Sequence, residues 1–290
     1  MMKMIKLNNK KNRKKMLITI TIILIGILSG CISSNENNDI QTLVVDGSTT
    51  VFPIAQATAD NYMDIHSNVD IQVTGTGSSN GVTAVGSGSA DIGMASRELK
   101  DSEKISYPNL VKYVIAKDGI ALIVHTSNTV TQLTMDQVKG IYNGTYTNWN
   151  QLAGLDEEIV VVGRDSASGT REFFYEHVMG KENFVSTMLE KNSNGAVHLT
   201  VTTTPGAIGY VGLGYVDNDV KSISILNKDE SIYIAPTVQN VLDGKYTISR
   251  NLNMFTNGEA TGPVKDFIDY IQSNEGQEIV EEQGFVPINQ

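Results

Sequence analysis

The sequence has little cysteine and little histidine, and each scarcity excludes a class of protein. A single cysteine in 290 residues excludes an internal disulfide framework. The histidines are widely scattered and show no metal-ligand spacing such as H-E-x-x-H. They are His66, His125, His177 and His198. Neither a metal site nor a cofactor is expected.

The N-terminal apolar run is also too short to be a comfortable membrane span. It covers residues 16–28, which is 13 residues, whereas a spanning helix needs about 20. The first thirty residues carry seven basic side chains and no acidic one, with a basic cluster just before the apolar run. This layout predicts an export signal over 1–30. An N-terminal anchor that is never cleaved is the alternative.

The end of the signal suggests lipid attachment. The segment "LSGC" at 28–31 resembles the lipobox of prokaryotic lipoproteins, in which the cysteine becomes the lipid-carrying first residue. We therefore expect Cys31 to be lipidated and to hold the exported protein on the outer face of the cell membrane. Residues 31–40 begin with the polar stretch "CISSNENND" and are predicted to be a flexible tether.

Positive charge is scarce once the signal is removed. The remaining chain has 15 basic and 32 acidic residues, a formal charge of −17. A field of this sign repels nucleic acid and anionic lipid surfaces, so nucleic acid is excluded as a partner.

The exported part alternates strand-like and helix-like patterns, which indicates an α/β fold. At 290 residues the chain is near the size where one core divides, so two lobes are expected. Strands are predicted at 42–45, 69–75, 90–96, 112–125, 158–163 and 245–256. Helices are predicted at about 51–65, from about 82, from about 170 to 178, after Thr134, and at 262–272.

Three loops between strands and helices share glycine and hydroxyl residues: "DGSTT" at 46–50, "GTGSSNG" at 75–81 and "GRDSASGT" at 163–170. A helix start presents unpaired N–H groups and a positive dipole end, and so attracts an anion. Any one such loop can serve only as a turn or an N-cap. Together they predict an oxyanion site.

Arginines strengthen that prediction. Arg164 stands at the carboxyl end of a predicted strand, the edge where open α/β sheets bind ligands, and its guanidinium matches a tetrahedral oxyanion. Arg97 ends another strand in the same way. Either arginine could instead pair with a neighbouring acid, Glu98 or Asp165.

The motifs together resemble a known family. The segments "DGSTTVFPIA", "TGTGSSNGV", "ADIGMASRELK", "VVGRDSASGTREFF", "TPGAIGYVGLGYV" and the C-terminal tail are similar to the phosphate-binding proteins of phosphate ABC importers, from about residue 42 to 288. The resemblance implies a periplasmic-binding-protein-like fold of type II, with two α/β lobes joined by a two-stranded hinge. Lobe 1 is then 41–118 with 226–290, and lobe 2 is 119–225. The hinge strands are expected within 112–125 and near 210–225.

The resemblance also implies a function. A monomeric receptor would bind inorganic phosphate between the lobes and deliver it to a permease that works with a cytoplasmic ATPase. The family's phosphate contacts carry over to Ser48, Thr49, Thr50, Ser78, Arg164, Ser168, Gly169 and Thr170.

One position departs from the family pattern. Some members have an aspartate that accepts the phosphate proton where this chain has Ser96 and Arg97. An acceptor-only carboxylate can repel sulfate, whereas a serine cannot. We expect Ser96 to accept weakly and Arg97 to add a contact, with Asp46 or Asp165 as alternative acceptors.

Two other classes remain open. A phosphatase or phosphotransferase would also cradle phosphate, but "GTGSSNG" lacks the Gly-Lys-Ser/Thr ending of a P-loop, and "SASGT" is not a G-x-S-x-G nucleophile elbow. The sequence therefore predicts a protein that is not an enzyme. An adhesion or scaffold protein could keep the fold without any ligand.

Overall fold

The computed structural model describes residues 40–227, 229 and 231–289. The predicted signal at 1–30, the lipid site at Cys31 and the tether up to residue 39 lie outside the described residues. No helix among those described is long and apolar enough to cross a membrane.

Twelve strands are assigned within the described residues. They are β1 (Gln41–Gly47), β2 (Val69–Thr74), β3 (Ile92–Ala95), β4 (Leu110–His125), β5 (Gln132–Leu133), β6 (Val160–Arg164), β7 (Leu189–Lys191), β8 (Ala207–Gly212), β9 (Val220–Ser222), β10 (Ser224–Asn227), β11 (Ile232–Ile234) and β12 (Ser249–Asn257). The predicted strands at 42–45, 69–75, 90–96, 158–163 and 245–256 all correspond to strands of the structure.

The helices follow the predicted alternation. They are α2 (Phe52–Ile65), α3 (Ser78–Ser87), α4 (Asp101–Ser106), α5 (Met135–Tyr142), α6 (Gly169–His177), α7 (Asn194–Thr203), α8 (Val238–Leu242), α9 (Gly262–Gln272) and α10 (Asn274–Glu282), with short 3₁₀ turns at η1 (Trp149–Leu152) and η2 (Leu213–Tyr215). The capping box predicted from Thr134 and Gln137 is present at the start of α5. The helix expected from about residue 82 begins earlier, because Ser78 already belongs to its first turn.

The main sheet runs in the order β2-β1-β3-β12-β4-β8-β6-β7, with β9 paired to β4. β1 is parallel to β2 and β3, and β6 is parallel to β7 and β8. Because β1 is parallel to β3 and β6 is parallel to β8, the segments that follow these strands leave the sheet at strand ends, where α/β folds bind ligands.

Two apolar cores lie on the two halves of this sheet. The first contains residues of β1, β3, α2 and α9, including Val45, Met94 and Phe267. The second contains residues of β8, α5 and α6, including Tyr142, Phe174 and Ile208. This is the two-lobed α/β architecture that was predicted, and each lobe has its own hydrophobic core.

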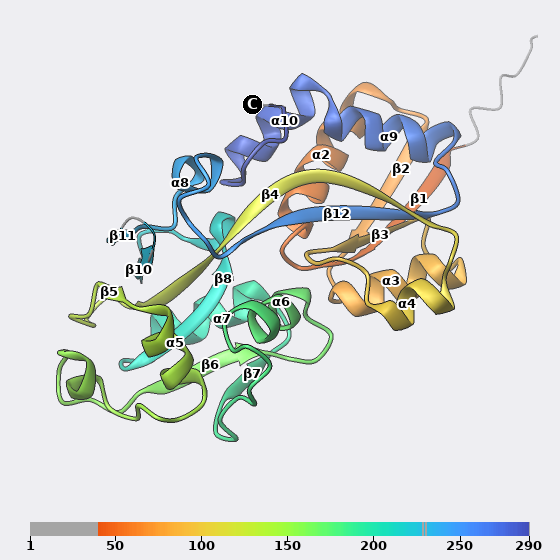
Figure 1. Cartoon of the computed structure of the whole chain (residues 1–290). Coiled ribbons are helices and arrows are strands. Elements are labelled where there is room, and N and C mark those ends of the chain that lie inside the picture. The colour runs from red at the N-terminus through yellow and green to blue at the C-terminus, as the bar shows by residue number, and fades with distance from the viewer. Residues whose placement is uncertain (1–39, 228, 230, 290) are drawn as a thin grey trace, which may run out of the picture. The chain divides into compact units, whose positions relative to one another are not determined.

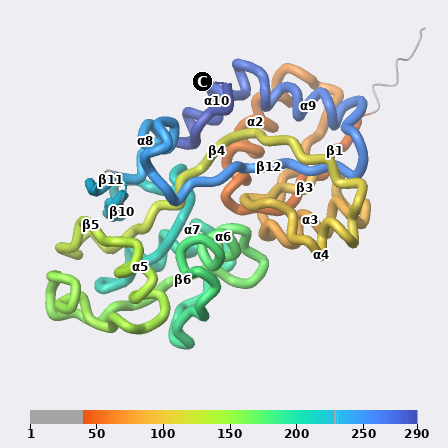
Figure 2. Tube along the Cα trace, viewed as in Figure 1, coloured from red at the N-terminus to blue at the C-terminus, as the bar shows by residue number. Residues whose placement is uncertain are grey.

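Strands β4 and β12 join the two cores. All of β12 pairs antiparallel with residues 110–119 of β4, and the two strands run together from one lobe to the other in Figures 1 and 2. Ala116 and Leu252 lie in the first core, while Ile120 and Ile248 lie in the second. The hinge strand expected in 112–125 is therefore confirmed as β4.

The second expected hinge strand, near 210–225, is wrong. Residues Val211, Val220 and Ile225 all pack within the second core, and β12 makes the second crossing instead. The same core includes Val241 and Tyr246, which lie beyond the predicted domain boundary at 225/226. The boundaries at 118/119 and 225/226 themselves stay predictions.

A close approach of α3 to β1 fixes where α3 begins. A Cβ on Gly81 would lie 2.6 Å from the Asp46 carbonyl oxygen and 2.6 Å from the Gly47 Cα. These are backbone atoms that cannot rotate away. We expect Gly81→Ala to lower the free energy of unfolding by about 1–3 kcal/mol, because extra volume in a packed contact forces the backbone apart.

A matched helical glycine provides the control for this prediction. A Cβ on Gly195, in α7, meets nothing within 4 Å, so Gly195→Ala should be neutral or stabilise by up to about 1 kcal/mol. Equilibrium urea unfolding measures both variants. Equal midpoints for the two would contradict the close approach.

Candidate oxyanion site

A small hollow lies where the two lobes meet, and we call it the site hollow. Its empty volume, open solvent included, is about 110 Å³, and no part of it is wide enough for a water molecule. Its lining residues are Ser48, Thr49, Thr50, Gly77, Ser78, Ser96, Arg164, Ser168, Gly169 and Thr170. Nine of the ten residues predicted from the sequence therefore lie together, with Gly77 in addition. Arg97 is the predicted residue that does not line the hollow.

Strand ends and helix starts bring these residues together. The segment 48–50 follows β1, Ser96 follows β3, and Arg164 ends β6. Ser78 is the first residue of α3, and Ser168 caps α6 by accepting a hydrogen bond from the Arg171 N–H at 3.2 Å. The first N–H groups of a helix have no intrahelical partner, so both helix starts offer donors to an anion.

The α6 start is held very close to the opposite lobe. A Cβ on Gly169 would lie 2.3 Å from Ser78 Oγ and 2.9 Å from Ser96 Oγ. Only glycine allows this approach, because any larger residue would clash with the two serines. The resulting hollow is narrow, so it suits only a ligand with few atoms.

Arg164 supplies the formal charge of the site hollow. The residue is 1% exposed. Its Nη2 donates to Thr49 Oγ1 at 3.1 Å and to the Asn192 carbonyl at 3.2 Å, whereas its Nη1 has no partner within the described residues. Burial lowers the pKa of the guanidinium to about 10, although Tyr210 and Asp165 act in the opposite direction. Arg164 is therefore still charged near neutral pH.

The charge on Arg164 is not balanced by a carboxylate. Among the described residues, no ion pair includes Arg164, although Asp165 is its neighbour in the chain. A buried cation is costly unless an opposite charge or hydrogen bonds compensate it. The free Nη1 in a hollow lined by hydroxyls is thus suited to an anion.

A second buried arginine, which the sequence analysis missed, stands beside the site hollow. Arg250 of β12 lies opposite Asp118 of β4 in the strand register. Its Nη2 donates to Asp118 Oδ2 at 2.9 Å and to Thr170 Oγ1 at 2.9 Å. The Asp118 carboxylate is fully buried, and it also accepts the Leu213 N–H at 2.9 Å. Burial raises the pKa of Asp118, while Arg250 and the Leu213 N–H act to lower it.

A buried asparagine was missed as well. Asn194, the first residue of α7, donates through Nδ2 to Thr49 Oγ1 at 3.1 Å and to Thr50 Oγ1 at 3.0 Å. It belongs to a fourth segment, "KNSNGAV" at 191–197, in which a strand is followed by small polar residues and a helix. The three predicted loops have the same composition, so this pattern is the sequence signal from which Asn194 could have been predicted.

Contacts across the site hollow join the lobes directly. Thr50 Oγ1 lies 3.1 Å from Thr170 Oγ1, and the Ser79 N–H donates to the Ala167 carbonyl at 3.1 Å. The Tyr215 hydroxyl donates to the Thr49 carbonyl at 2.6 Å. The lobes are therefore closed around the site hollow.

Arg97 faces a neighbouring space instead. Its guanidinium donates to both carboxylate oxygens of Glu103 at 2.7 Å and to Ser79 Oγ at 3.1 Å. Arg97 therefore pairs with an acid, as the sequence allowed, but with Glu103 and not with Glu98, whose carboxylate pairs with Lys112.

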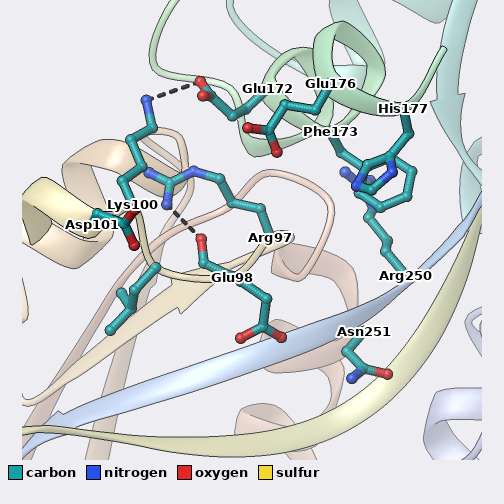
Figure 3. Close-up of a pocket in the computed structure, with 11 residues that line it drawn as sticks. Arg97, Glu98, Lys100, Asp101, Glu172, Phe173, Glu176, His177, Arg250 and Asn251 are labelled. Carbon is teal, nitrogen blue, oxygen red and sulfur yellow. Dashed lines mark hydrogen bonds and ion pairs between the residues drawn. The ribbon is translucent and has the colours of Figure 1, made fainter. Parts of the chain in front are cut away.

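Arg97 lines a larger cleft of about 500 Å³, in which Lys100 and Glu172 form an ion pair at 2.9 Å between the lobes. Figure 3 shows these side chains around the cleft. The predicted contact of Arg97 with phosphate stays a prediction.

The alternative proton acceptors also lie outside the lining. Asp46 Oδ1 accepts the Thr76 hydroxyl at 2.7 Å, and Asp165 Oδ1 accepts the Ala167 N–H at 3.2 Å. Neither carboxylate lines the site hollow. Within the described residues, no group of histidine, cysteine or acidic side chains could hold a metal, and no histidine lines the site hollow.

Comparison with known proteins points to one family. The sequence matches the PBP superfamily domain over residues 33–275. It is 33% identical over 248 residues to the phosphate-binding protein PstS of Bacillus subtilis, which covers 85% of this chain and 81% of that protein. It is 32% identical over 284 residues to the PstS of Borreliella burgdorferi, covering 95% of this chain and 99% of that one.

A solved structure agrees with the sequence relatives. A putative phosphate ABC transporter substrate-binding protein with bound phosphate from Clostridium perfringens is 37% identical, with a TM-score of 0.80. The match covers 86% of this chain and all of that one.

The buried ion pair between the hinge strands should matter for stability. We expect Asp118→Ala to lower the free energy of unfolding by about 3–5 kcal/mol, because it leaves the Arg250 charge buried and uncompensated. Asp269→Ala removes the partner of Lys265 in an exposed pair on α9 and should have no measurable effect. Urea denaturation compares the two; a small loss for Asp118→Ala would show that Arg250 is compensated by other groups.

Proposed function

Because this chain belongs to the PBP superfamily, and within it to the phosphate-binding proteins of phosphate ABC transporters, we propose that the site hollow holds inorganic phosphate. The protein is an extracytoplasmic receptor that binds phosphate for uptake by an ABC importer, and it is not an enzyme. The observation that carries the site assignment is the buried Arg164 guanidinium, which has a free Nη1 and no carboxylate partner among the described residues.

The lining of the site hollow fits this ligand. Hydroxyl groups, helix starts and one guanidinium converge on a space of about 110 Å³. The hollow is too narrow for an organic ligand, which needs a pocket of roughly 300–1,000 Å³, so a compact oxyanion suits it better. We assign the phosphate contacts to Ser48, Thr49, Thr50, Ser78, Ser96, Arg164, Ser168, Gly169 and Thr170.

Closure of the lobes supplies the signal for transport. A ligand that contacts both lobes binds the closed form better than the open form, and so shifts the population towards closure. In this proposal Thr50 from one lobe and Thr170 from the other contact the same anion. The permease would then recognise the closed receptor, which acts as a monomer.

Substitutions of Arg164 and Arg97, which lie at or just beyond the ends of two strands, allow a direct test of the proposed site. We expect Arg164→Ala to weaken phosphate binding by at least about thirtyfold, because truncating one partner of a buried charged hydrogen bond costs about 2–5 kcal/mol. Arg97→Ala should weaken it by less than about tenfold, since the Glu103 ion pair occupies its guanidinium. Titration calorimetry of both folded variants gives the comparison.

The outcomes distinguish a phosphate-binding protein from a scaffold without ligand and from an enzyme. Equal losses for the two variants would support a direct phosphate contact by Arg97. Binding unaffected by Arg164→Ala would contradict the site and favour a scaffold that keeps the fold without ligand. Turnover of a chromogenic phosphate ester by the wild-type protein would contradict a role in binding alone.

Lipid anchoring is part of the same proposal. We expect two acyl chains on Cys31, because one chain gives only marginal membrane binding. Expressed in a bacterium, the wild-type protein should fractionate with membranes and Cys31→Ser should not, whereas Ser33→Ala should behave as wild type. Mass spectrometry of the N-terminal peptide reads the modification. An unmodified Cys31 in membrane-bound protein would favour the uncleaved anchor.

A further inference from the structure

Asn194 is fully buried, and its amide can adopt only one orientation. Its Oδ1 accepts the Gly212 N–H at 3.2 Å, and a backbone N–H can only donate. The Nδ2 group must therefore face the other side, where its two hydrogens reach Thr49 Oγ1 and Thr50 Oγ1. Asn194 does not line the site hollow itself, but it contacts two residues that do.

These bonds determine what the two threonines can offer a ligand. A hydroxyl has two acceptor lone pairs and one donor hydrogen. Thr49 Oγ1 accepts from Arg164 and from Asn194, so both of its lone pairs are used. Thr50 Oγ1 accepts from Asn194 at 3.0 Å and from Arg250 Nη2 at 3.4 Å. Thr49 is left only with its hydrogen to give to a ligand, and the hydrogen of Thr50 is directed to Thr170 Oγ1 at 3.1 Å.

Other hydroxyl oxygens of the site hollow also accept hydrogen bonds from the protein. Thr170 Oγ1 accepts from Arg250 at 2.9 Å and lies within 3.1 Å of the Thr50 hydroxyl. Ser48 Oγ accepts the Thr50 and Val51 N–H groups at 3.2 and 3.4 Å. These oxygens also have little acceptor capacity left for a ligand.

Ser96 differs from these hydroxyls. Its Oγ has one hydrogen-bonding neighbour within the described part of the chain, Ser78 Oγ at 3.4 Å. Ser78 Oγ already accepts the Ser96 N–H at 3.1 Å. Ser96 Oγ is therefore the lining hydroxyl most able to accept a proton from a ligand.

We propose that Asn194 is a positioning residue that keeps Thr49 and Thr50 from accepting a ligand hydrogen, so that the site hollow selects the phosphate dianion over its dihydrogen form. The proposal rests on the phosphate site above. The dianion brings one P–OH group, which Ser96 Oγ accepts. The dihydrogen form brings two, and its second hydrogen meets a hydroxyl that can only donate.

Several titratable groups face this network from the elements packed around it. They are Arg164 on β6, Asp118 on β4, Arg250 on β12, Tyr210 on β8 and Tyr215 on η2. On α7 itself, His198 pairs with the exposed Asp217. Burial raises the pKa of Tyr215 to about 12. Sulfate provides an internal reference for all of them, because it gains no proton in the range where phosphate does.

The test measures phosphate and sulfate binding by calorimetry with the full chain. It compares about pH 5 with about pH 8, a range in which a phosphate group gains its second proton. In the wild-type protein, the ratio of phosphate to sulfate association constants should be about tenfold higher at the upper pH, because an unsatisfied buried donor is costly. In Asn194→Ala the threonine oxygens can accept a hydrogen bond from the ligand. The change in the phosphate-to-sulfate ratio between the two pH values should then fall to about threefold or less.

Two further variants complete the design. Asn128→Ala truncates another buried asparagine, one that does not line the site hollow, and should keep the wild-type ratios. Asn194→Asp preserves the side-chain shape but replaces the two donors by an acceptor. Thr49 and Thr50 should then donate to the carboxylate and accept from the ligand, so the phosphate-to-sulfate ratio should be higher at the lower pH.

The unfavourable outcomes are distinct. Equal weakening of both anions in Asn194→Ala and Asn194→Asp, with an unchanged pH dependence of the ratio, would overturn the positioning role and leave a structural one. A wild-type ratio independent of pH would overturn the selection of the dianion. Absence of phosphate binding by the wild-type protein at either pH would overturn the proposed function as well.

Discussion

A buried guanidinium without a carboxylate partner is the constraint on which the site depends. Arg164 is almost completely buried, and its Nη1 has no partner in the described part of the chain. Such a charge is tolerated only when polar groups surround it and an anion can complete the set. The Thr49 hydroxyl and the carbonyls of Lys191 and Asn192 accept hydrogen bonds from this guanidinium. A small oxyanion supplies the remaining acceptor.

The hinge strands take part in the same network. The Arg250–Asp118 pair crosses between β12 and β4, and the Arg250 guanidinium reaches Thr170 of the second lobe. The strands that join the lobes thus also carry a charge that holds the site hydroxyls in place. This connects closure of the lobes to the orientation of donors, since both depend on the same buried contacts.

Local sequence was a good guide to the strand–loop–helix units and a poor guide to the hinge. The loops at 46–50, 75–81 and 163–170 carry composition that any helix start of this kind needs, so their residues could be named in advance. The second hinge strand could not, because both β8 and β12 pair with β4 in the folded chain. Which of them crosses between the lobes depends on pairing with β4, a contact distant in sequence.

By itself the sequence determined the alternation of strands and helices, the acidic surface and most residues of the site, because glycine, hydroxyl and arginine side chains act through their immediate backbone. Only the tertiary structure decided the partners of each group. It paired Arg97 with Glu103, Arg250 with Asp118, and Asn194 with two threonines. Hydrogen-bond direction depends on which groups meet across the fold, and no local pattern encodes that meeting.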